Sequence, residues 1–232
     1  MSLELDELKK QAAHRAVEEV RSGMTVGLGH GSTALHAVRK LARLVSLGRL
    51  KGITCVPCSN QVAAEAAGLG LALASLEEHP YLDLTIDGAD EVDPDLNLIK
   101  GGGGALLREK IVAQNSRREI IVVDRTKLSP ALGTKVDLPV EAVYYGIRPQ
   151  ISFLASLGAE PRVRLTDQGR PFRTDQGNVI LDCRFGPLAD PVALARALAG
   201  RAGLVEHGLF LGLATEVIVA GPEGIRALTA NG

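Results

Sequence analysis

Two aspartates, a lysine and a run of glycines occur close together near the middle of the chain. Asp87 and Asp90 lie in the segment DGADE, and Lys100 precedes four glycines at residues 101–104. Four consecutive glycines are costly in backbone entropy, so they favour a place where the backbone approaches a ligand closely. Glu109 follows on the next expected helix. Because carboxylates near a lysine can be tuned for proton transfer, the pattern indicates acid–base chemistry on a small molecule.

Glu109 also has a plainer interpretation. Its neighbours Arg108 and Lys110 are typical of a solvated helix face, on which Glu109 would be an ordinary surface ion-pair residue. The nearby aspartates, lysine and glycines favour the catalytic interpretation. Asp87 closes an expected strand, and Gly88 allows a tight turn directly after it.

A second glycine-rich segment, GLGHGST at residues 27–33, lies between an expected strand and an expected helix. Backbone N–H groups of such a turn, together with the helix dipole, bind phosphate. Ser32 and Thr33 add hydroxyl donors, or they cap the helix. A dinucleotide fingerprint needs a glycine where Ser32 stands, and a Walker loop needs Gly-Lys-Ser/Thr. The turn therefore predicts either phosphate binding without a nucleotide or a purely structural turn.

The elements that must position these residues alternate between strand and helix. We expect strands at residues 24–28, 53–56, 71–74, 82–86 and 120–123, and helices at residues 5–20, 33–47, 61–67 and 105–114. This alternation predicts an α/β fold with a mostly parallel, Rossmann-like sheet flanked by helices. In such sheets ligands bind at the carboxyl ends of the strands. The glycine-rich turn, Asp87 and Asp124 each follow an expected strand, so we expect them at one edge.

The pattern changes near residue 133. We expect a strand at 136–140, helices at 148–157 and 190–199, and a hairpin of strands at 161–165 and 178–183. This order indicates a smaller α+β, ferredoxin-like domain. The apolar segment 209–220 is expected to rejoin the first sheet. We therefore predict a catalytic domain at 1–132 plus 207–232, and a small domain at 133–206.

The bulk properties argue against several partners. The net charge is −1, aromatic residues are 3% of the chain and tryptophan is absent, so nothing favours nucleic acid. No apolar run reaches the length of a membrane span, and the first residues lack the apolar core of a signal peptide. Three cysteines fit a reducing compartment, and we expect the cytoplasm. Cys55 and Cys58 lack the second pair of a zinc site and are expected to be structural.

Three segments carry a family resemblance: GLGHGSTA, TIDGADEVDPDLNLIKGGGGALLREKIVA and VVDRTKL. They closely resemble the A-type ribose-5-phosphate isomerases, and the resemblance extends over nearly the whole chain. It implies reversible interconversion of D-ribose 5-phosphate and D-ribulose 5-phosphate through an enediol(ate), in the non-oxidative branch of the pentose phosphate pathway. It also implies no metal or nucleotide cofactor, and a homodimer or tetramer in which the small domain at 133–206 forms the subunit contact.

The resemblance also assigns residues. It matches Glu109 to the proton-transferring base, and Lys127 and Lys9 to lysines on the phosphate side. Asp87, Asp90 and Lys100 match the cluster that binds the substrate and opens the sugar ring. The implied substrate contacts are His30, Gly31, Ser32, Thr33, Asp87, Gly88, Ala89, Asp90, Lys100, Gly101, Gly102 and Gly103. His30 departs from the threonine that is usual in the family, which puts sugar preference in question.

Other functions stay open at this point. An amino-sugar phosphate isomerase–deaminase would use a related sheet and would release ammonia. A sugar-phosphate sensor domain would bind without turnover and usually carries a helix-turn-helix, for which the opening helix leaves no room. Acyl-CoA transfer is a further alternative, and it would need a glutamate that can be trapped as a thioester.

Overall fold

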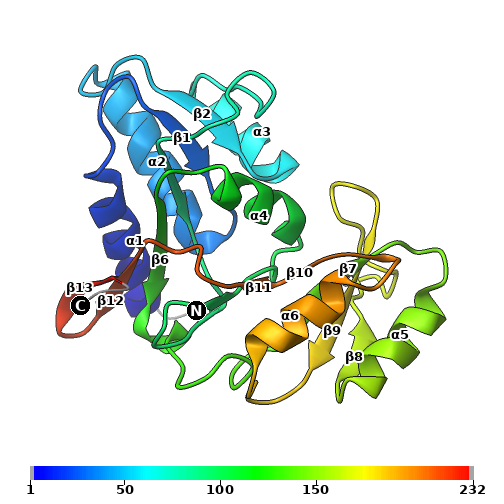
Figure 1. The fold of residues 1–232 in the computed structure, drawn as a ribbon. Helices are drawn as coiled ribbons and strands as arrows, with labels where there is room; N and C mark the ends of the chain where they lie inside the picture. Colours follow the sequence, from blue (N-terminus) through cyan, green and yellow to red (C-terminus); the bar gives the residue numbers. More distant parts are fainter. Residues whose placement is uncertain (1–2, 230–232) are drawn as a thin grey trace. The chain divides into compact units, whose positions relative to one another are not determined.

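The computed structural model describes residues 3–229 (Figure 1). They divide into two compact units. The first comprises residues 3–89, 108–128 and 212–229, and the second comprises residues 90–107 and 129–211. No helix in the described range is long and apolar enough to cross a membrane.

A six-stranded sheet forms the centre of the first unit. Its strands are β1 (Thr25–Leu28), β2 (Thr54–Pro57), β3 (Leu84–Asp87), β6 (Glu119–Asp124), β12 (Glu216–Gly221) and β13 (Gly224–Thr229). The order is β13-β12-β6-β3-β1-β2, and every neighbouring pair is parallel except β12 and β13. The expected mostly parallel sheet is therefore confirmed, and the C-terminal segment joins it through β12. The strand expected at 71–74 is wrong, because only Leu73 bridges to β2, at Cys55.

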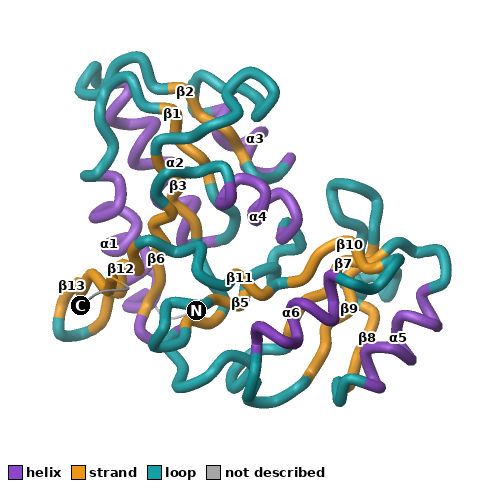
Figure 2. Tube along the Cα trace, viewed as in Figure 1, coloured by secondary structure: helices purple, strands orange, loops and turns teal. Residues whose placement is uncertain are grey.

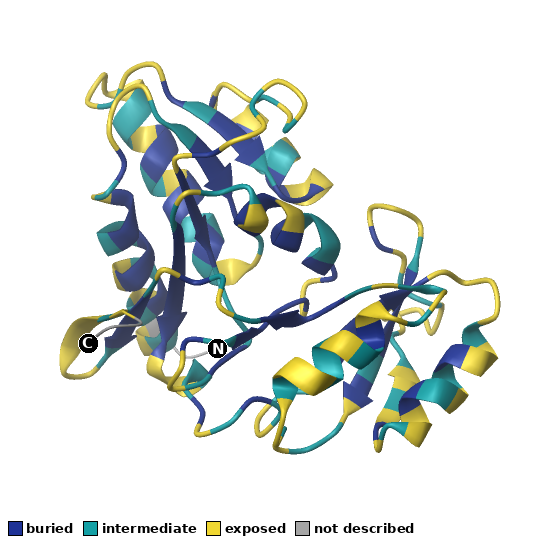
Figure 3. Ribbon diagram, in the orientation of Figure 1, coloured by how far each residue is buried: buried dark blue, intermediate teal, exposed yellow. Residues whose placement is uncertain are grey.

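Helices cover this sheet and close its core. They are α1 (Leu3–Val17), α2 (Ser32–Ser46), α3 (Asn60–Gly68) and α4 (Leu106–Gln114), with a short 3₁₀ helix η1 (Arg125–Lys127) after β6. The alanines of α1 let it pack closely, and Ala12, Ala13 and Ala16 are fully buried beside α2 and the strands. A separate apolar cluster places Val112 of α4 against Val56 and Leu82. Figure 3 shows that the strands of this sheet are mostly buried, except for the edge strand β13, which is largely exposed.

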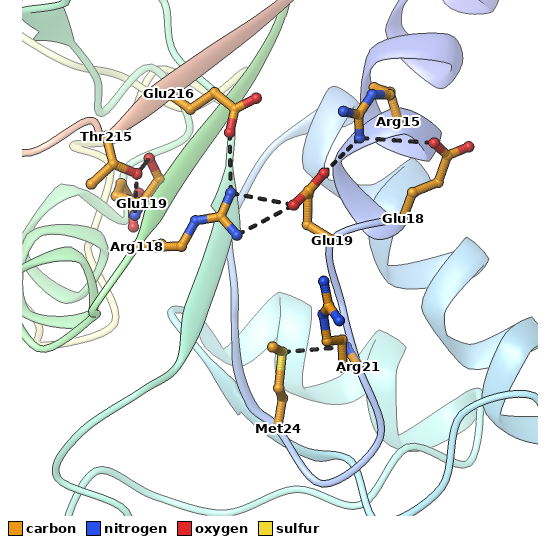
Figure 4. Close-up of polar contacts among 9 residues, drawn as sticks. All are labelled: Arg15, Glu18, Glu19, Arg21, Met24, Arg118, Glu119, Thr215 and Glu216. Atoms are coloured by element: carbon orange, nitrogen blue, oxygen red, sulfur yellow. Dashed lines mark hydrogen bonds and ion pairs between the residues drawn. The ribbon is translucent and has the colours of Figure 1, made fainter. Parts of the chain in front are cut away.

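Ion pairs connect the C-terminal end of α1 and the residues after it to the sheet (Figure 4). Arg118, directly before β6, donates to Glu19 at 3.3 Å and to Glu216 of β12 at 3.2 Å. Glu19 also accepts from Arg15 at 2.8 Å. The hydrogen bond from Arg15, with help from Arg118, lowers the pKa of Glu19, so its carboxylate stays ionised to a lower pH than an ordinary glutamate.

The second unit has a four-stranded antiparallel sheet in the order β10-β7-β9-β8. Its elements are β7 (Leu138–Ala142), α5 (Ile147–Ser156), β8 (Glu160–Val163), β9 (Val179–Arg184), α6 (Pro191–Ala199) and β10 (Leu204–His207). The β-α-β-β-α-β succession and the β8–β9 pairing confirm the ferredoxin-like expectation. A three-stranded sheet of β4 (Glu91–Val92), β5 (Leu98–Ile99) and β11 (Leu209–Phe210) belongs to the same unit.

The predicted domain boundaries stay a prediction. The largest difference concerns residues 90–107, which were predicted in the catalytic domain but belong to the second compact unit. These residues belong to the second unit because β5 pairs with β11, Leu98 opposite Phe210. Glu91 adds polar contacts in the same unit, since its carboxylate accepts from the backbone N–H groups of Gly133, Thr134 and Lys135.

Candidate active site

Three loops meet at the carboxyl edge of the first unit's sheet, after β1, β2 and β3 (Figure 2). The hydrogen-bond ladder continues past the strand ends and draws the loops together. Gly29 N–H donates to Ile86 O at 3.0 Å, and Cys58 N–H donates to Leu28 O at 3.0 Å. The first turn of α4 brings Glu109 to the same place, because its carboxylate and that of Asp87 have oxygens within 4.8 Å of each other.

Asp87 is held firmly in this arrangement. It is 1% exposed, and its Oδ1 accepts from His30 N–H at 2.9 Å and from Gly88 N–H at 2.6 Å. Gly29 lies against the same carboxylate and leaves no room for a β-carbon. The expectation that Asp87 and the glycine-rich turn share one sheet edge is therefore confirmed.

Asp124 lies at the same edge of the sheet, where its carboxylate serves as a helix cap. Its Oδ1 accepts from Thr126 N–H at 2.9 Å, so it caps η1. Lys127 ends this short helix and is half-buried. The loop after β6 therefore contributes a fixed backbone and one lysine.

The glycine-rich turn leads into α2 without a side-chain cap. Gly31 occupies the cap position with φ 107°, a conformation that favours glycine. Ser32 and Thr33 are therefore the first helical residues rather than caps. Lys9 of α1 is 7% exposed and donates to Ser32 Oγ at 3.1 Å. An ammonium group, hydroxyls and the N–H groups of a helix start are thus gathered in one place, as phosphate binding requires.

Glu109 is not a surface residue. It is 4% exposed on the first turn of α4, and its neighbour Lys110 is 5% exposed. Arg108 is the neighbour that reaches outward, and it donates to Asn60 Oδ1 at 2.9 Å. The interpretation of Glu109 as a solvated ion-pair residue is therefore wrong.

Cys58 was not expected in this group. Its Sγ lies within 4.8 Å of carboxylate oxygens of both Asp87 and Glu109, and all three residues are buried. Among the described residues, this trio is the set of side chains close enough to hold a metal ion. Cys55 is fully buried, and burial raises the pKa of its thiol to about 12, which disfavours the reactive thiolate near neutral pH. The spacing of the two cysteines gave no sign of this difference.

The remaining expected residues, Asp90, Lys100 and Gly101 to Gly103, lie in the second unit. Asp90 Oδ2 accepts from Gly102 N–H at 2.7 Å, which fixes the carboxylate against the glycine run. Lys100 is 2% exposed, and its Nζ lies 5.4 Å from the centroid of the Phe210 ring. Such a cation–π contact stabilises a buried ammonium group.

Backbone conformation and packing also require glycine at positions in the run at residues 101–104. Gly101 and Gly104 have φ of 105° and 83°, and a β-carbon on Gly104 would lie 2.4 Å from the Phe172 ring. Arg164 holds the run from outside, donating to the carbonyls of Gly101 at 2.8 Å and Gly102 at 3.0 Å. Sequence reasoning missed Arg164, because no local pattern links it to glycines more than sixty positions away.

Comparisons with known proteins agree with this architecture. The family model described as "Ribose 5-phosphate isomerase A (phosphoriboisomerase A)" matches residues 54–224. Ribose-5-phosphate isomerase A of Chloroflexus aurantiacus is 56% identical over 96% of this chain and 93% of its own. That of Desulfatibacillum aliphaticivorans is 56% identical over 97% of this chain and 98% of its own.

A solved D-ribose-5-phosphate isomerase in complex with phospho-erythronic acid superposes with a TM-score of 0.95. It is 35% identical and covers 99% of this chain and 100% of its own. Sequence and fold thus agree over almost the full length. The chain belongs to the ribose 5-phosphate isomerase A family and is an isomerase of ribose 5-phosphate and ribulose 5-phosphate.

Proposed function

We propose that Glu109 is the base with which this isomerase moves a proton between C1 and C2 of the sugar. The observation that carries the proposal is a buried carboxylate beside a second, firmly held carboxylate, Asp87, at the ligand edge of the sheet. A base that is shielded from water can be placed against carbon, and charges that develop beside it are weakly screened.

The reaction balances with this one base. The carboxylate of Glu109 takes the C2 proton of the open-chain aldose, and the electron pair left behind forms the C1–C2 double bond. The carbonyl π electrons move onto O1, which then takes up a proton. The proton on O2 is lost as the C2 carbonyl forms, and Glu109 returns its proton to C1. Hydrogen-bond donors near the oxyanion lower the barrier.

Asp87 is suited to assist at the hydroxyl end of the sugar. The two backbone N–H groups that hold its Oδ1 fix the orientation of the carboxylate. A carboxylate fixed in this way can bind a sugar hydroxyl and exchange a proton with it as the furanose ring opens.

The phosphate is proposed to bind at the start of α2. Ser32, Thr33 and Lys9 lie there together with the N–H groups of the first helical turn. Lys127 is proposed as a further cation on the phosphate side. Binding energy from the phosphate then positions the reacting carbons, so contacts remote from the chemistry contribute to the rate.

The other assignments also stay proposals. Asp90 and Lys100 are proposed to bind the substrate and stabilise the oxyanion, supported by their fixed and buried positions. Assembly as a homodimer or tetramer rests on the family resemblance. A cytoplasmic site of action is supported by the odd number of cysteines, three, which fits a reducing compartment.

Incubation with ribose 5-phosphate in D₂O, without added cofactor, tests the mechanism. We expect ribulose 5-phosphate that carries deuterium at C1 in part of the product, because a proton held on the shielded Glu109 exchanges with solvent in only some turnovers before it returns to carbon. Complete retention of the original hydrogen would argue against exchange at a carboxylate base. Release of ammonia from glucosamine 6-phosphate would favour the deaminase alternative, and binding without turnover would favour a sensor.

A further inference from the structure

Ser59, which neither the motifs nor the proposed mechanism uses, contacts His30 in the glycine-rich turn. The two residues lie on different loops, and Ser59 Oγ is 2.9 Å from His30 Nδ1. Ser59 is 3% exposed and caps α3, because its Oγ accepts from Val62 N–H at 3.1 Å. The backbone N–H of His30 donates to Asp87 Oδ1. The imidazole of His30 therefore contacts the loop after β2, while the backbone of His30 contacts Asp87 at the end of β3.

The direction of the Ser59–His30 bond follows from hydrogen-bond accounting. A serine hydroxyl has one proton to donate, and a buried donor is normally satisfied. Oγ already accepts from Val62, and among the described residues His30 Nδ1 is the partner within reach of its proton. If Ser59 donates to Nδ1, the neutral ring carries its own proton on Nε2. Nε2 is then a hydrogen-bond donor.

His30 also lines a cavity of about 270 Å³ in the first unit. The cavity lies between the glycine-rich turn and α3, with Ser32 and Gln61 among its lining residues. Ser32 is the residue that Lys9 contacts at the proposed phosphate site. His30 therefore lines a cavity that also includes a residue of the proposed phosphate site.

We propose that Ser59 is a positioning residue that orients His30, keeps the ring proton on Nε2 and so makes His30 a specificity-determining donor to a substrate oxygen. This inference rests on the proposed function, because it assumes that the glycine-rich turn binds the sugar phosphate.

The tautomer can be measured without turnover. Nitrogen-15 NMR of the wild-type protein, with the His30 signals assigned by their loss in His30→Ala, is expected to show a proton on Nε2 and none on Nδ1. Ser59→Asp keeps an acceptor for Val62 N–H, so α3 stays capped, but it has no proton to donate. We expect Nδ1 to become protonated in this variant. A wild-type ring protonated on Nδ1 would overturn the proposal.

Kinetics test the contact with substrate. His30→Ala and Ser59→Ala are each expected to raise KM for ribose 5-phosphate about three- to tenfold, the value of one hydrogen bond, with kcat nearly unchanged. Ser59→Thr keeps the hydroxyl and should restore KM. In the His30→Ala background, Ser59→Ala should change KM no further. The same substitution also removes the cap of α3, so it should lower the unfolding midpoint equally in wild-type and His30→Ala protein.

Two outcomes count against the kinetic argument. If the two single effects on KM add in the double variant, Ser59 acts through α3 rather than through His30. If KM is unchanged in His30→Ala, the donor does not contact substrate. Failure of the proposed phosphate site is distinguishable from both, because Lys9→Ala would then leave KM unchanged, while the NMR result still reports on the Ser59–His30 bond.

Discussion

Gly29 and Asp87 are in direct contact, and the contact admits no side chain on Gly29. A β-carbon there would lie 2.2 Å from Asp87 Oδ1 and 2.4 Å from Asp87 Cα. The backbone atom cannot move aside without displacing the end of β3. The glycine thus fixes how closely the loop after β1 approaches the carboxylate.

Gly29→Ala is expected to separate this loop from β3. We expect unfolding free energy to fall by about 1–3 kcal/mol, as for other overpacked sites, and kcat/KM to fall about 10²-fold through misplacement of Asp87. Urea unfolding and initial rates measure the two effects. Gly68→Ala is the control, because a β-carbon at Gly68 meets nothing within 4 Å. A fully active Gly29→Ala protein would contradict the proposed importance of this contact.

Glu109→Gln preserves the shape of the side chain and removes the base. We expect kcat to fall by ~10² or more, while KM changes little, because the base acts in the transition state. Steady-state kinetics with ribose 5-phosphate measure this. Glu77→Gln alters an exposed glutamate in the same unit and should leave both constants unchanged. Near-normal turnover by Glu109→Gln would remove Glu109 from the role of base.

Lys9→Ala removes the cation beside Ser32. We expect KM to rise by about 10-fold to 100-fold, since a charged hydrogen bond to phosphate is lost, and kcat to change far less. The neighbouring Lys10→Ala provides a matched control, because the Lys10 side chain is 44% exposed and pairs with Glu7. If the two variants have the same KM, the phosphate does not bind at this end of α2.

Helices and the parallel sheet could be predicted because their signals are local. The periodic alanines of α1 and the apolar strands β1, β3 and β6 each show their period within a few residues. β4, β5 and β11 could not be predicted, because each has only two residues and is defined by its partner. Residues 71–74 look like a strand, but the chain stays beside β2 for a single bridge.

The candidate site was predictable only in part. Asp87 follows a strand, and that placement alone directs it to the ligand edge. The burial of Glu109 was not readable, because Arg108 and Lys110 give its helix a solvated pattern. Ser59 and Arg164 act through hydrogen bonds to segments far away in the chain, for which a single sequence carries no signal.

Glu141 gives a pH dependence of stability that is separate from catalysis. It is fully buried in β7, where its Oε1 accepts from Thr174 and Asn178, both at 2.9 Å. Burial raises the pKa of this carboxyl above its ordinary 4.5. Its favourable contribution is therefore complete below the ordinary pKa and is lost as the pH rises through the folded pKa.

Glu141→Gln should make this dependence visible. The amide keeps an acceptor for both hydrogen bonds and does not ionise, so the variant should gain stability relative to wild type as the pH rises above the ordinary pKa of 4.5 and through the raised pKa of the folded state. Urea unfolding at several pH values measures the difference. Glu223→Gln, at an exposed position, should show no such trend. A pH-independent difference for Glu141→Gln would mean that the carboxyl is not perturbed in the folded state.

Chelation tests the expectation that no metal takes part. The proposed proton transfers use carboxylates and hydrogen-bond donors, so dialysis against EDTA should leave kcat/KM unchanged. If activity is lost and returns with a divalent cation, the trio Cys58, Asp87 and Glu109 is the place to look. Cys58→Ser should then weaken the dependence on the added ion.

The guanidinium of Arg164 gives the β8–β9 hairpin a part in shaping the glycine run. Arg164 donates to the backbone carbonyls of Gly101 and Gly102, and it also donates to the carboxylate of Asp182 in β9. Shortening or exchanging this hairpin would therefore change the conformation of the glycine run. The sequence of the hairpin alone gives no sign of this connection. Swaps between homologues should keep Arg164 and Asp182 as an inseparable pair.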